Sequence, residues 1–187
     1  MNKILVIYNI YGGPGSNENF EYYKTALDSL LIQDCDIQVI VSGCCTSNKV
    51  KSFLKKEYTN EVDYLWIDEK VPVNISFNLA CKLGDKRFGP FESFLYLDSG
   101  ISFEEKTSVI AEMYKLFESG DYGIVSARPS NDSGHFDQWR DKNYKLHENH
   151  LIAPGEFLNS HCDLYSRKIL DYYGGILPDL VSGYYGE

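Results

Sequence analysis

The stretch FLYLDSGI, residues 94–101, joins an apolar run to a carboxylate and then to a flexible turn. Its first four residues have the composition of a buried strand, and that strand ends at Asp98. An ionised carboxylate without a partner in a low-dielectric setting costs several kcal/mol of stability, so Asp98 requires donors, water or a cation. The residues alone leave two roles open. Asp98 either accepts backbone N–H groups in an Asx-type turn or contacts a divalent metal.

Strand patterns alternate with helix patterns on both sides of this stretch. Apolar runs typical of buried strands end in loops, and residues at helical spacing follow most of these loops. The expected strands are residues 3–9, 36–43, 63–68, 92–98, 121–127 and 156–165. This alternation predicts an α/β fold with a mostly parallel central sheet and helices on both faces. Ligands of such sheets bind beyond the carboxyl ends of the strands, which here are Asn9, Ser42, Asp68, Asp98 and Arg128.

Local signals predict where some helices and loops begin and end. Ser102 and Glu105 have the spacing of a capping box and predict the start of the helix after residues 92–98, and Gly120 predicts its end. A short helix is expected at residues 168–172. Residues 128–150 are polar and without periodicity, which predicts a long loop, and such a loop in a compact domain usually has a function.

Length, charge and cysteine usage restrict the class of protein. A chain of 187 residues is expected to form one domain, residues 1–187. A net charge of −9 disfavours binding to nucleic acid and to anionic membranes. The five cysteines form no C-x-x-C pair, and no apolar run has the length of a membrane span. We therefore expect a cytoplasmic protein with reduced thiols.

Four short segments carry a resemblance to a known family. They are IYN (residues 7–9), VIVSGCCTSN (39–48), NLACKLG (78–84) and FLYLDSGI (94–101). Their order and spacing resemble glycosyltransferases of the GT-A fold, particularly of the family 2 type, over nearly the whole chain. The resemblance implies a Rossmann-like GT-A fold and a hexosyltransferase type of activity. A nucleotide diphosphate-sugar would be the donor, a saccharide or another hydroxyl compound the acceptor, and the transfer would proceed with inversion.

The resemblance also implies the residues of a donor site. Asp98 would help to hold a divalent cation, Mn²⁺ or Mg²⁺, together with the diphosphate. The nucleotide-sugar site would further include Tyr8, Asn9, Ser42, Asn78 and Ser99. Structural roles remain open beside these, since Tyr8 can pack on the first helix and Asn78 can be a helix-surface or capping residue.

Later segments resemble the acceptor side of the family. The segment NSHCDLYSRKILDYYGGI, residues 159–176, places His161 there, although a lone histidine on a strand is also a common structural residue. Trp139 and Arg140, in the polar loop, can form one wall of a sugar site or a tucked surface loop. The final SGYYGE resembles the stretch that ends in the catalytic acid, which implies that Glu187 accepts the acceptor's proton as general base. A solvated glutamate is the alternative.

Two positions depart from the family pattern. Ser42 and Gly43 stand where an acidic pair is common, and Gly100 stands where the metal motif has its second aspartate. One carboxylate, water and the ligand's phosphates can complete octahedral coordination, but the affinity for free metal is then expected to be low.

The missing second aspartate and the end of the sequence at Glu187 favour one alternative function, and a second alternative is also considered. The first is a noncatalytic or incomplete GT-A-like nucleotide-binding module of a longer enzyme. The second is a sugar-phosphate nucleotidyltransferase, because such enzymes use a related sheet. They generally have a basic glycine-rich loop after the first strand, whereas YGGPGSNEN, residues 11–19, contains no lysine or arginine.

Overall fold

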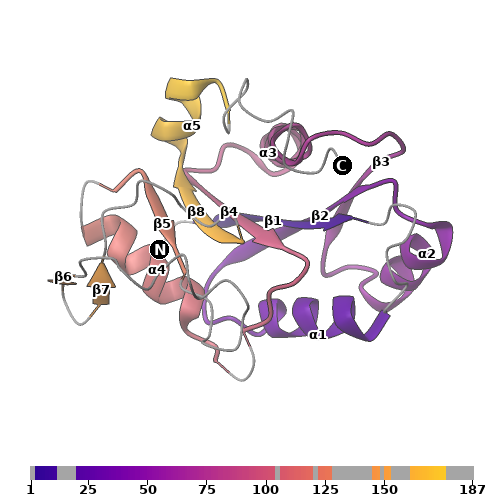
Figure 1. Ribbon diagram of the computed structural model, residues 1–187, viewed down its shortest axis with the longest axis horizontal. Coiled ribbons are helices and arrows are strands. Elements are labelled where there is room, and N and C mark those ends of the chain that lie inside the picture. Colours follow the sequence, from indigo (N-terminus) through magenta and orange to yellow (C-terminus); the bar gives the residue numbers. More distant parts are fainter. Residues whose placement is uncertain are drawn as a thin grey trace.

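The structure is a computed structural model that describes residues 3–11, 20–103, 106–119, 122–127, 145–147, 150–152 and 161–175. A twisted sheet lies between helices on its two faces (Figure 1). The sheet has six strands in the order β3-β2-β1-β4-β8-β5. Their bounds are β1 (Ile4–Tyr11), β2 (Ile37–Cys44), β3 (Asp63–Ile67), β4 (Ser93–Asp98), β5 (Ile124–Ser126) and β8 (Cys162–Ser166).

The sheet is mostly parallel, as the sequence predicts. β2 is parallel to both β1 and β3, and β1 is parallel to β4. β8 is antiparallel to β4 on one side and to β5 on the other. The antiparallel strand therefore brings its first residues to the carboxyl end of β4, which is the edge where ligands of parallel sheets bind.

Helices cover both faces of the sheet. α1 (Phe20–Leu31), α2 (Asn48–Glu57) and α4 (Val109–Ser119) lie on one face, and α3 (Val73–Phe88) and α5 (Arg167–Tyr173) lie on the other (Figure 1). Alternate residues of β1 point to opposite faces. Ile4 and Val6 pack in the core that contains Leu27 of α1, whereas Leu5 packs in the core that contains Phe77 of α3.

The helix after β4 begins later than the sequence predicts. The predicted start at Ser102 is wrong, because α4 begins at Val109. The side chain of Phe103 is buried in the core, and its N–H donates to the Oγ of Ser29 at 3.0 Å, so α1 holds this segment as an irregular connection. At the helix start, the N–H of Ile110 donates to Oε1 of Gln33 at 3.3 Å. The two other residues of the prediction, Glu105 and Gly120, lie outside the described residues.

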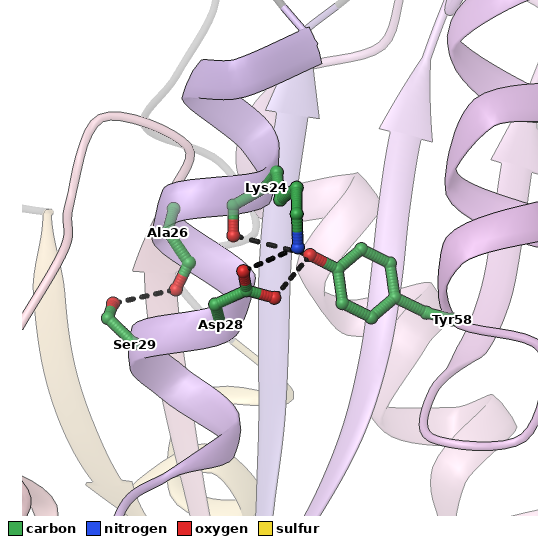
Figure 2. A network of polar contacts seen from close by, with 5 residues as sticks. All are labelled: Lys24, Ala26, Asp28, Ser29 and Tyr58. Atoms are coloured by element: carbon green, nitrogen blue, oxygen red, sulfur yellow. Dashed lines mark hydrogen bonds and ion pairs between the residues drawn. The ribbon is translucent and has the colours of Figure 1, made fainter.

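A network of polar contacts fixes α1 against the end of α2 (Figure 2). The hydroxyl of Tyr58 donates to Oδ1 of Asp28 at 2.8 Å and to the carbonyl of Lys24 at 3.2 Å. The Nζ of Lys24 contacts Oδ2 of Asp28 at 2.6 Å. One turn away, the Oγ of Ser29 donates to the carbonyl of Ala26 at 2.8 Å. These contacts set the position of α1 beside the sheet.

Part of the predicted polar loop is ordered as strands. β6 (Lys145–His147) and β7 (His150–Ile152) form an antiparallel pair that is separate from the main sheet. The predicted long loop therefore includes strand residues at 145–147 and 150. The rest of residues 128–150 lies outside the described part of the chain.

None of the helices in the described ranges has the length and apolarity that crossing a membrane requires. All five cysteines lie within those ranges and are free thiols. A cytoplasmic location remains a prediction.

Candidate functional site

The candidate site lies where β4 ends beside β1. Asp98 is the last residue of β4 and is in register with Asn9 of the parallel strand. The chain then turns, since the N–H of Ser99 donates to the carbonyl of Asn9 at 3.0 Å and the N–H of Ile101 donates to the carbonyl of Asp98 at 3.0 Å. The Ile101 bond is to the backbone oxygen of Asp98, so it leaves the Asp98 carboxylate available for other partners.

His161 is the principal partner of the Asp98 carboxylate. The Nδ1 of His161 lies 3.1 Å from Oδ2 of Asp98, and the side chains are 18% and 22% exposed. The backbone of the same two residues is joined as well, because the N–H of Asp98 donates to the carbonyl of His161 at 2.8 Å. The hydrogen bond to Asp98 raises the pKa of His161, and burial opposes this change. An acidic residue at the ligand edge is thus held by an imidazole.

Tyr8 and Ser99 support the turn from β1. The hydroxyl of Tyr8 donates to the carbonyl of Ser99 at 3.3 Å, and the Oγ of Ser99 donates to Oδ1 of Asp98 at 3.4 Å. Tyr8 is fully buried, and this burial is the main reason that its pKa is raised. Tyr8 therefore remains a neutral donor that positions the turn beneath the site.

Two other predicted site residues lie in a buried network under α3. The Oγ atoms of Ser42 and Ser76 are 2.7 Å apart, and Ser76 donates to Oδ1 of Asn9 at 3.2 Å. The Nδ2 of Asn9 donates to the hydroxyl of Tyr96 at 3.5 Å. Ser42 is fully buried, so in this arrangement it supports the strand end. Its contact with a base or ribose remains a prediction.

The remaining predicted residues are less closely tied to Asp98. Asn78 of α3 lies against the backbone that follows α5, because a Cβ added at Gly175 would be 2.5 Å from its Nδ2. Trp139, Arg140 and Glu187 lie outside the described residues, and their roles remain predictions. Among the predicted residues, the structure joins Tyr8, Asn9, Asp98, Ser99 and His161 at one strand end.

Tyr22, which no sequence pattern singled out, reaches this turn from the first turn of α1. A Cβ added at Gly100 would lie 2.7 Å from the hydroxyl oxygen of Tyr22. Burial raises the pKa of Tyr22, the charge of Asp98 raises it further, and a hydrogen bond with the Ser99 side chain opposes both. Tyr22 is 44% exposed, whereas its neighbour Tyr23 is in the core. One sequence feature could have identified Tyr22. It is an aromatic residue outside the buried face of the helix, in the helical turn nearest the ligand edge of the sheet.

Asp98 could serve as the protein ligand of a divalent cation that is already bound to phosphate groups. Within the described ranges, no group of three or more histidine, cysteine or acidic side chains is arranged to hold a metal ion. A magnesium-like cation bound to a diphosphate needs one or two protein carboxylates, since phosphate oxygens and water complete its shell. The partly exposed carboxylate of Asp98 meets this smaller requirement.

A scan against protein-family models and a search of curated proteins find no match. Solved structures do match. PcManGT, a mannosyltransferase from Pyrobaculum calidifontis in complex with GDP-Man and Mn²⁺, has a TM-score of 0.69 and 15% identity over 92% of this chain and 46% of that chain. TarS from S. aureus has a TM-score of 0.58 and 17% identity over 92% of this chain and 49% of that chain.

A third similar structure is 4-diphosphocytidyl-2C-methyl-D-erythritol synthase from Anaerococcus prevotii, with a TM-score of 0.55 and 13% identity over 97% of this chain and 79% of that chain. The chain spans about half the length of PcManGT and TarS, 46% and 49%. Identities this low show a shared fold and leave activity open. The expected fold is confirmed: this protein has a GT-A type, Rossmann-like α/β fold.

Proposed function

We propose that the protein binds a nucleotide diphosphate-sugar at the carboxyl end of β4 and transfers the sugar to a hydroxyl acceptor. One observation carries the proposal: a partly exposed carboxylate, Asp98, is fixed at the ligand edge of a GT-A sheet by His161. PcManGT, which is similar over most of this chain, is in complex with GDP-Man and Mn²⁺, and this supports the same class of donor.

The negative charge of the chain explains why the proposed site needs a cation, and a carboxylate to hold it. The chain has a net charge of −9, so its long-range field repels a diphosphate. A divalent cation, when bound, neutralises the negative charge that develops on the leaving diphosphate. Asp98 would hold that cation through its carboxylate and so position the diphosphate over the end of β4.

His161, Tyr8 and Ser99 act in this proposal by positioning Asp98. His161 engages Oδ2 at 3.1 Å, so the carboxylate has a fixed orientation before the donor binds. Tyr8 holds the carbonyl of Ser99 at 3.3 Å and keeps the turn in place. Fixed polar groups lower the cost of reorganisation when the charged ligand arrives.

The acceptor half of the reaction rests on the resemblance of the sequence. The acceptor hydroxyl must lose a proton as it attacks the anomeric carbon, and Glu187 is the proposed general base. Trp139 and Arg140 are the proposed sugar-contacting residues of the acceptor side, and inversion is the proposed outcome. His161 contacts Asp98 of the proposed donor site at 3.1 Å, and its place on the acceptor side is part of the proposal.

A product assay tests the proposal against its alternatives. The protein is incubated with a panel of nucleoside diphosphate-sugars and Mn²⁺ or Mg²⁺, with and without simple saccharide acceptors, and released nucleotide is identified. Release of a nucleoside diphosphate with a transferred or hydrolysed sugar supports glycosyl transfer. Formation of pyrophosphate from a nucleoside triphosphate and a sugar phosphate would support nucleotidyl transfer instead. Binding without turnover would support a noncatalytic module.

A further inference from the structure

Tyr22 and Gly100 form a close contact above the candidate site. Tyr22 belongs to α1, and Gly100 is the second residue after β4. A Cβ at Gly100 would lie 2.7 Å from the hydroxyl oxygen of Tyr22 but 4.0 Å from its Cζ atom. Only the hydroxyl therefore conflicts with a larger residue, since 4.0 Å is an ordinary van der Waals separation.

The backbone conformation of Gly100 does not explain the glycine. The described glycines with positive φ are Gly89, Gly174 and Gly175, so Gly100 has a backbone conformation that other residues adopt. What the absent Cβ provides at Gly100 is space, and the group that uses this space is the hydroxyl of Tyr22.

Polar contacts hold α1 in place on two sides. On the β4 side, Nε2 of Gln33 donates to the carbonyl of Lys106 at 2.6 Å, and the N–H of Asp34 donates to the carbonyl of Thr107 at 2.7 Å. On the other side, Tyr58 holds α1 through the network of Figure 2. The helix that carries Tyr22 is thus tied directly to the segment that follows the Asp98 turn.

The chemical state of Tyr22 suits an anionic ligand. A tyrosine hydroxyl has an ordinary pKa of about 10, so the phenol of Tyr22 is neutral and protonated at physiological pH. A neutral O–H can donate to a phosphate oxygen without adding negative charge beside Asp98, and hydrogen bonds to charged acceptors are among the stronger ones. The residue is 44% exposed, and on binding its hydroxyl would exchange its contact with the Ser99 side chain for a phosphate oxygen.

We propose that the hydroxyl of Tyr22 is a further contact for the diphosphate of the donor, and that Gly100 leaves the space this hydroxyl needs. The inference rests on the proposed function and adds a binding residue from α1 to the same site. The pair is coupled: enlarging residue 100 displaces the hydroxyl, whereas removing the hydroxyl makes room for a Cβ.

A double-mutant cycle tests this coupling. Wild type, Tyr22→Phe, Gly100→Ala and the double variant are titrated with UDP and with GDP in the presence of Mn²⁺ by calorimetry, and the melting temperature of each is recorded. Each single variant is expected to bind about tenfold more weakly, the effect of one lost hydrogen bond to a charged group. The double variant is expected to bind no more weakly than Tyr22→Phe, because the phenyl ring leaves room for the Cβ.

Controls separate the possible failures. Tyr172→Phe removes a hydroxyl from an exposed tyrosine of α5 and is expected to bind as wild type does. Unchanged binding by Tyr22→Phe, beside weakened binding by Asp98→Asn, overturns this inference and leaves the proposed function intact. A further additive loss in the double variant overturns the role of Gly100. If wild type binds neither diphosphate, the inference and the proposed function both fall.

Discussion

Asp98 and His161 are joined twice, through their backbones at 2.8 Å and through their side chains at 3.1 Å. The two residues are 63 positions apart in the sequence and meet only because β8 enters the sheet antiparallel to β4. The arrangement gives the ligand edge a carboxylate whose orientation is set before any ligand binds.

The side-chain contact between these residues is expected to contribute to stability. Both side chains are mostly buried, so replacing either by alanine removes a charge-assisted hydrogen bond worth about 1 kcal/mol or more. A cycle of Asp98→Ala, His161→Ala and the double variant, measured by urea denaturation at neutral pH, is expected to show a coupling free energy of about 1 kcal/mol. Additive effects of the two replacements would show that the side chains are near each other without stabilising the fold.

Asp163 is expected to make stability depend on pH. It is fully buried on β8, where it lies opposite Tyr96 of β4 and Ser126 of β5, and its Oδ2 accepts a hydrogen bond from Tyr165 at 3.2 Å. Burial raises its pKa to about 6, although Ser126, Tyr165 and His161 oppose this. The carboxyl of an unfolded chain has a pKa of about 3.9.

Because the folded-state pKa is the higher one, the folded protein binds the proton of Asp163 more tightly than the unfolded chain does. Protonated Asp163 contributes on the order of 3 kcal/mol to the free energy of unfolding below pH 4. This contribution is lost as the pH rises through 6. Asp163→Asn is expected to remove this part of the pH dependence and to raise the free energy of unfolding at pH 7.5. The free energy of unfolding of each protein is measured by chemical denaturation from pH 4 to pH 7.5. If it depends on pH in the same way for wild type and Asp163→Asn, the assignment to Asp163 is refuted.

The buried serines under α3 are expected to differ in their effect on stability. Ser76 contacts both Ser42 and Asn9, whereas the hydroxyl of Ser42 contacts only Ser76 among the bonds described. Ser76→Ala leaves two buried polar groups without this partner and is expected to cost about 1–3 kcal/mol. Ser42→Ala is expected to cost less. Equal losses in chemical denaturation would show that the network is not organised around Ser76.

Strand ends and helix faces were predictable because their signals are local. The run of residues 94–97 is apolar on both faces, so it predicts a central strand, and Asp98 marks where that strand meets solvent. The same reasoning placed Asn9 and Ser42 near the carboxyl ends of their strands, although β1 continues to Tyr11 and β2 to Cys44. It could not tell toward which face each side chain points, and for Ser42 that face is the buried one under α3.

The contacts that complete the site depend on how the strands and helices are arranged in space. The alternation of strands and helices does not specify that β8 lies between β4 and β5, so the contact of His161 with Asp98 has no local signal. Likewise, the approach of Tyr22 to Gly100 depends on how α1 crosses the end of β4. The predicted capping box at Ser102 was wrong because burial of Phe103 outweighs a local preference for helix.

The most direct test of the proposed donor site is a calorimetric titration of UDP and GDP, each with Mn²⁺, into wild type, Asp98→Asn and Asp36→Asn. Asp36 is an exposed residue just before β2, at the opposite end of the strands, so its replacement removes the same charge away from the site. We predict that Asp98→Asn binds at least about tenfold more weakly, a loss of about 1.4 kcal/mol, and that Asp36→Asn binds as wild type does. Equal affinity of wild type and Asp98→Asn would contradict the account.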